Sequence, residues 1–170
     1  MKIPTLTLVL CLLANEVVAG AQQDFFASTV TKASRVVVVR VDPPKERDTP
    51  AVHVAVIDSR DLRTIRKVIG AIEMEDPEPK ERNGDEEVWS GSVLTFGVAE
   101  YIIRFFAGEQ MILEYGTDSK LGFLAPFGAS AKQPIDLWVD YPLSKRSASQ
   151  LKSIIREAEK GPTRRYRQPR

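Results

Sequence analysis

The stretch AEYIIRFFAGEQMILEYG, residues 99–116, decides the fold that we expect for this chain. Its two halves are rich in β-branched and aromatic residues, and Gly108 lies in the short segment between them. Two such runs joined by a short glycine-containing link are typical of a β-hairpin. We therefore predict antiparallel strands over residues 99–106 and 111–116.

The register of this hairpin follows from its side chains. We expect Ala107 to face Met111 around Gly108-Glu109-Gln110, because this pairing separates apolar from charged side chains, whereas a slip by one residue would mix the two faces. Arg104 and Glu114 then form an ion pair on a solvated face, where such a pair contributes about 0–1 kcal/mol. The facing residues are Ile103 and Tyr115, Phe105 and Leu113, and Arg104 and Glu114.

Further strand patterns lie on both sides of this hairpin. SRVVVVRV (residues 34–41) and AVHVAVI (residues 51–57) are β-branched runs, and Pro43-Pro44 between them cannot donate to a strand ladder. These two runs predict a second hairpin with a long loop. More strands are expected over residues 88–96, 120–124 and 135–141.

Two segments have the apolar periodicity of amphipathic helices. The first covers residues 62–72, about four turns, with Asp58 or Ser59 as its N-cap. Its opposite side carries Arg60, Arg63 and Lys67, which we interpret as a solvent face. The second follows a cap at Ser144 or Ser147 and ends at Gly161-Pro162. Its expected buried stripe consists of Ala148, Leu151, Ile154, Ile155 and Ala158.

The predicted fold is α+β: an antiparallel sheet of about five to seven strands with two amphipathic helices packed on one face, a two-layer sandwich. A single domain is expected over residues 34–160. A lead-in segment with a weak pattern for a short helix precedes it at residues 22–33. A basic tail follows at residues 161–170, and we expect this tail to be disordered because it comes after a helix stop.

Residues 1–21 have the pattern of a cleavable signal peptide. A lysine follows Met1, residues 6–14 are apolar, and Ala19-Gly20-Ala21 supplies small residues for cleavage. An uncleaved anchor is the competing interpretation, but Asn15 and Glu16 interrupt the apolar run well short of the roughly 20 residues of a membrane span. We expect a secreted or periplasmic protein with no transmembrane span after cleavage.

Composition excludes several classes of function. Cys11 is the only cysteine and lies in the signal segment, so disulfides and cysteine chemistry are not expected in the mature domain. The 24 Lys and Arg residues nearly balance the 23 Asp and Glu residues, which argues against a dedicated nucleic-acid binder. The acidic residues 73–87 and the arginines around Tyr166 are expected to be solvated, although the arginines could contact an anionic partner.

No catalytic motif stands out. His53 is the only histidine and lies in a predicted strand, and neither a metal-binding set nor a cofactor-binding loop is recognisable. Asp136 and Asp140 share a face of the predicted strand over residues 135–141, with Trp138 between them. Two carboxylates beside an aromatic ring would suit acid–base chemistry on a sugar.

Two functions remain open on the sequence. The first is a non-enzymatic exported module that binds a protein or an envelope polymer through aromatic side chains, for which Trp89, Phe106 and Trp138 are the candidates if they are exposed together. The second is a small hydrolase of a sugar or cell-wall polymer that uses Asp136 and Asp140. A regulatory domain that assembles with another subunit is a lesser alternative.

Overall fold

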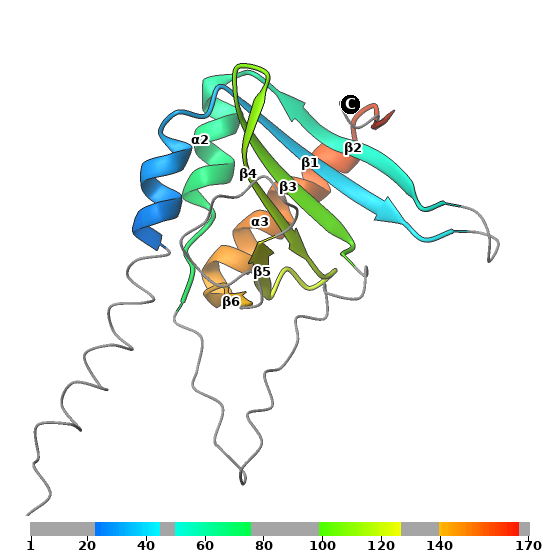
Figure 1. Cartoon of the computed structure of the whole chain (residues 1–170). Helices are drawn as coiled ribbons and strands as arrows, with labels where there is room; N and C mark the ends of the chain where they lie inside the picture. Colours follow the sequence, from blue (N-terminus) through cyan, green and yellow to red (C-terminus); the bar gives the residue numbers. More distant parts are fainter. Residues whose placement is uncertain (1–22, 45–49, 76–98, 127–139, 167–170) are drawn as a thin grey trace, which may run out of the picture.

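The sheet is antiparallel throughout and follows the order β6-β5-β4-β3-β1-β2-β7 (Figure 1). The structure is a computed structural model, and it describes residues 23–44, 50–75, 99–126 and 140–166. The seven strands and the helices beside them confirm the predicted α+β class.

Along the chain, the hairpin of β1 and β2 is followed by α2, and the strands β3 to β6 are followed by α3 and β7. The strands are β1 (Arg35–Asp42), β2 (Val52–Ser59), β3 (Tyr101–Ala107), β4 (Gln110–Thr117), β5 (Phe123–Pro126), β6 (Tyr141–Pro142) and β7 (Arg164–Arg165). The helices are one over residues 23–30, α2 (Leu62–Gly70) and α3 (Lys145–Glu159). The predicted strand at 88–96 and most of the one at 135–141 lie outside the described residues.

The β3–β4 hairpin has the predicted register along most of its length. Ile103 faces Tyr115 and Phe105 faces Leu113, as expected. Next to the turn the register shifts, so that Ala107 pairs with Gln110 rather than with Met111. The turn therefore has two central residues, and Gly108 adopts φ 62°. Glycine takes this backbone conformation without strain, and two-residue turns of this kind match the twist of the strands.

Helix α2 begins at Leu62, where its apolar pattern begins, but it has a different cap and ends earlier than predicted. β2 continues to Ser59, so neither Asp58 nor Ser59 can act as the cap. Asp61 takes that role, and its carboxylate accepts a hydrogen bond of 3.0 Å from the Thr64 amide. This hydrogen bond lowers the pKa of the Asp61 carboxyl. The helix has nine residues, about two and a half turns rather than four.

Helix α3 agrees with its prediction at both ends. Ser144 is the N-cap and accepts a hydrogen bond of 3.2 Å from the Ser147 amide. The helix stops at Glu159, just before Gly161-Pro162. Leu151, Ile154 and Ile155 are buried against the sheet. None of the helices in the described part of the chain combines the length and the apolar character that crossing a membrane requires.

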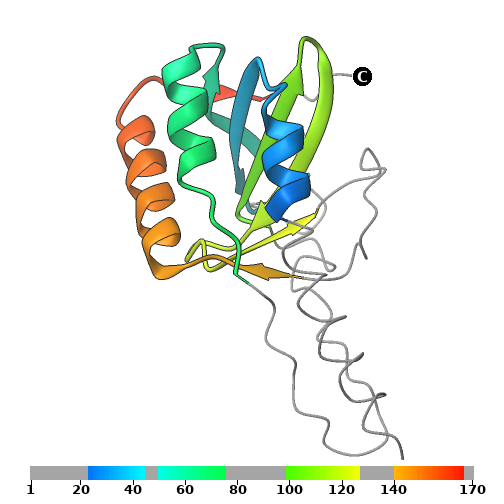
Figure 2. The ribbon, with the colours of Figure 1, turned by 90° about the vertical axis from the view of Figure 1, so that its left-hand side faces the viewer.

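All three described helices cover one face of the sheet, one more than predicted (Figure 2). The lead-in segment supplies the additional helix, over residues 23–30. Its Phe26 is 1% exposed and packs edge-on against Phe105 and Tyr115, at ring-centre distances of 5.9 and 6.1 Å. The lead-in is therefore part of the hydrophobic core.

The sheet face opposite the helices is buried as well, contrary to the expected solvated side. Ile102 and Phe106 lie in a second apolar cluster on this face. Between them, Arg104 donates from Nε to Glu114 Oε1 over 2.7 Å, and the two side chains are only 2% and 4% exposed. The Arg104 guanidinium also lies 5.1 Å from the centre of the Tyr166 ring. The expected exposed ion pair is thus wrong, because Tyr166 and apolar neighbours shield it from water.

Candidate binding edge at β2 and β7

The C-terminal segment joins the edge of the sheet, where a disordered tail was expected. After Gly161-Pro162 the chain turns back, and Arg164 and Arg165 pair with Ala55 and Val54 of β2. One residue further, the Tyr166 amide donates a hydrogen bond of 2.8 Å to the His53 carbonyl. Backbone hydrogen bonds to β2 therefore involve residues 164–166 of the segment for which we expected disorder.

A network of charged and phenolic side chains positions the end of α3, from which β7 follows. Arg40 on β1 donates to Glu159 over 3.1 Å and to Asp42 over 2.7 Å. The Tyr101 hydroxyl donates to the same Glu159 oxygen over 3.3 Å. Burial and the nearby Glu159 carboxylate raise the pKa of Tyr101. Hydrogen bonding to Asp42 and Glu159 raises the pKa of Arg40, so its guanidinium stays charged.

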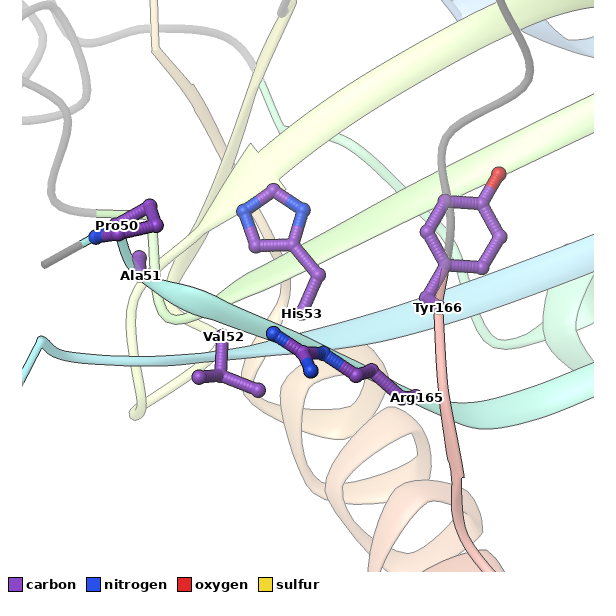
Figure 3. Close-up of a pocket in the computed structure, with 6 residues that line it drawn as sticks. All are labelled: Pro50, Ala51, Val52, His53, Arg165 and Tyr166. Atoms are coloured by element: carbon purple, nitrogen blue, oxygen red, sulfur yellow. The ribbon is translucent and has the colours of Figure 1, made fainter.

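One hollow lies where β2 and the end of β7 meet (Figure 3). It has a volume of about 610 Å³. His53 and Tyr166 project to the same side of β2, while Arg165 extends along the strand (Figure 3). The hollow therefore offers an imidazole, a phenol and a guanidinium. Its lining residues are Pro50, Ala51, Val52, His53, Arg165 and Tyr166.

A second hollow, a groove of about 740 Å³, lies along β2 beside α3. Its apolar lining comes from Val56 and Ile57 of β2 and from Ile154 and Ala158 of α3. Its charged lining comes from Arg35, Asp58, Lys67, Glu157, Arg164 and Arg165. We call this groove, together with the hollow of Figure 3, the β2–β7 edge.

The charges of the β2–β7 edge do not cancel. Arg35 donates to both Asp58 carboxylate oxygens, at 2.7 and 2.8 Å, and this hydrogen bonding raises the pKa of Arg35. Lys67 donates to Glu157 over 3.2 Å. Arg164 and Arg165 are exposed, and neither makes an ion pair with any other residue in the described ranges. Two exposed cations of this edge therefore have no anionic partner among the described residues.

The two predicted site residues that the structure describes, Phe106 and Asp140, do not line this edge. Trp89, Asp136 and Trp138 lie outside the described residues, so the pairing of two carboxylates stays a prediction. Asp140 is half-buried just before β6. Phe106 is 2% exposed and is covered by the Arg35 guanidinium, 5.3 Å from its ring centre. Phe106 is therefore not available as an exposed contact.

The residues of the edge were partly visible in the sequence. The sequence indicates a possible anion contact at Tyr166 and its neighbouring arginines, but their position after a helix stop predicts disorder. Sequence reasoning did not assign a strand to residues 164–165. Thr163 and Tyr166 flank the two arginines, and threonine and tyrosine both favour strands, so these two residues were a local signal for the strand.

The described residues contain no group of three or more His, Cys, Asp or Glu side chains arranged to hold a metal ion. Comparisons with protein-family models, with curated proteins and with solved structures found no match for this chain.

Proposed function

We propose that this protein is an exported, non-enzymatic module that binds a protein or an envelope polymer, and that it does so through the β2–β7 edge. The observation that carries the proposal is the pair Arg164 and Arg165. Both are exposed on a hydrogen-bonded strand between two hollows, and neither is engaged in an ion pair within the described part of the chain.

The chemistry of the edge suits an anionic group. Guanidinium groups donate several hydrogen bonds in a fixed planar arrangement that matches carboxylates and phosphates. His53 and Tyr166 add two further polar groups beside Arg165 in the hollow of Figure 3. Because β7 is attached to the sheet, the backbone that carries Arg164, Arg165 and Tyr166 is held in place before a ligand arrives, which reduces the entropy that binding costs.

Export to the periplasm or the outside of the cell is the second part of the proposal. It rests on the apolar run at residues 6–14 and the small residues at 19–21. N-terminal sequencing of the protein from its own cells tests this part. We expect the mature chain to begin near Gln22. Intact chain beginning at Met1 in the soluble cell interior would contradict export.

Site-specific photo-crosslinking tests the binding part. A photoreactive residue is placed at Val52, which lines the hollow of Figure 3 together with Arg165 and is 36% exposed, so that both arginines stay in place. The full chain is then exposed to the envelope fraction of its own cells. The matched control carries the same residue at Arg146, an exposed position at the opposite end of α3. We expect a defined adduct from position 52 and not from 146. Equal adducts from the two positions, or none from either, would refute a specific contact surface at the edge.

A further inference from the structure

We propose that the β2–β7 edge binds an acidic, extended segment of a partner protein, which adds to the sheet as a strand along β2 beyond β7. This inference rests on the proposed binding function and names the class of its partner. It follows from three properties of the edge: backbone of β2 with which no described strand pairs, an apolar groove beside it, and surplus positive charge.

The backbone of β2 is only partly paired on its outer side. β2 has eight residues, but β7 pairs with just Val54 and Ala55. Among the described strands, none pairs with residues 56–59 on that side. An unpaired strand edge presents N–H and C=O groups that can pair with an incoming strand, a recurrent way of binding extended peptides.

The groove lies along this unpaired part of β2. Val56 and Ile57 contribute from the strand, and Ile154 and Ala158 contribute from α3. A bound strand places alternate side chains on opposite faces. Side chains on one face of the ligand would therefore enter the groove, while those on the other face would point away from α3.

The charged residues that line the groove favour an acidic ligand. The groove lining contains four cations, Arg35, Lys67, Arg164 and Arg165, and two anions, Asp58 and Glu157. The anions are each paired with a cation, Asp58 with Arg35 and Glu157 with Lys67. The surplus is therefore carried by Arg164 and Arg165, at the point where an added strand would meet β7. Acidic side chains at that end of the ligand complement them.

Fluorescence anisotropy with three short synthetic peptides tests the proposal on the full chain. The first peptide alternates glutamate with threonine or valine, the second replaces each glutamate by lysine, and the third is the acidic peptide with all its backbone amides N-methylated. The third keeps the charge but has no backbone N–H on either edge to donate to a strand ladder. We expect the acidic peptide to bind, and each of the other two to bind at least about tenfold more weakly.

Charge reversal locates the site. We expect Arg164→Glu with Arg165→Glu to weaken binding of the acidic peptide by about tenfold, the combined effect of two partly exposed ion pairs. The matched control, Lys145→Glu with Arg146→Glu, makes the same charge change on exposed residues at the other end of α3 and leaves binding unchanged. Circular dichroism shows whether both variants keep the fold.

Three outcomes would overturn the inference: equal binding of the N-methylated peptide, equal binding of the lysine peptide, or no binding of the acidic peptide. In each case a crosslink from position 52 to an envelope component would leave the proposed function standing. The absence of both peptide binding and crosslinks would refute the inference and the proposed function together. Amide hydrogen exchange gives a direct readout, since a bound strand slows exchange in residues 56–59.

Discussion

The two faces of the central sheet are both buried, but they are built from different chemistry. On the helix-covered face, aromatic and aliphatic side chains pack together, and Phe26 lies against Phe105 and Tyr115. The opposite face places the Arg104–Glu114 ion pair among apolar side chains and beneath Tyr166. Truncating a buried apolar side chain lowers the free energy of unfolding in proportion to the apolar volume removed. Removing one partner of a buried ion pair leaves the other charge buried without a partner, so that loss does not scale with the size of the side chain.

The largest expected effect tests this difference on the helix-free face. Glu114→Leu leaves the Arg104 charge buried without its partner, so we expect a loss of about 3–5 kcal/mol in the free energy of unfolding. The double variant Arg104→Met with Glu114→Leu removes both charges and should recover most of that loss. Urea unfolding measures both variants. Equal losses for the single and the double variant would show that the pair does not act as a unit.

The corresponding test on the helix-covered face uses the lead-in helix. Phe26→Ala removes a side chain that is 1% exposed, and we expect a loss of about 3 kcal/mol. Phe25→Ala is the matched control, because Phe25 is only partly buried against the same core and should cost less. Urea unfolding of the two variants gives the comparison. If both substitutions cost the same, residues 23–30 do not pack on the sheet in the way described.

A smaller effect is expected where the terminal segment covers the ion pair. Tyr166→Ala removes the ring that lies 5.1 Å from the Arg104 guanidinium, and we expect a loss of about 1 kcal/mol. Tyr166→Phe keeps the ring and serves as the control, with a smaller loss expected. Thermal unfolding followed by circular dichroism measures both. A loss with Phe equal to that with Ala would assign the effect to the hydroxyl rather than to the ring.

The smallest effect is a pH dependence at the rim of the helix-covered face. The pKa of Tyr101 is raised in the folded protein, so its contribution to stability is fully present below the ordinary tyrosine pKa of about 10 and is lost as pH rises through the folded value. Tyr101→Phe removes this contribution, and stability should then fall less steeply above pH 10. Denaturant unfolding at several alkaline pH values shows the difference. Parallel pH profiles for the two proteins would contradict it.

The β3–β4 hairpin could be predicted because its determinants are local. The alternation of apolar and charged residues and the Gly108 turn specify most of the pairing between residues that are close in sequence. The departure at Ala107 and Gln110 is local as well, since a two-residue turn matches strand twist better than a three-residue link. The N-cap at Ser144 and the end of α3 just before Gly161-Pro162 could be predicted for the same reason.

The candidate site could not be predicted to the same extent. The arginines near Tyr166 were recognised as a possible anion contact, but β7 depends on β2, more than a hundred positions earlier in the chain. No local pattern in a two-residue strand indicates such a partner. The apolar run of β1 did carry a sign of burial on both faces, since four consecutive valines suit a strand covered on each side.

The residue pattern alone therefore determined the α+β class, the hairpin pairing and the helix that ends at Gly161-Pro162, because each depends on periodicity and turn chemistry within a short stretch. Tertiary structure alone decided that the Arg104–Glu114 pair is buried and that residues 164–166 pair with part of the edge strand β2. Burial depends on which distant segments come to lie on a face, and alternation in one strand does not contain that information.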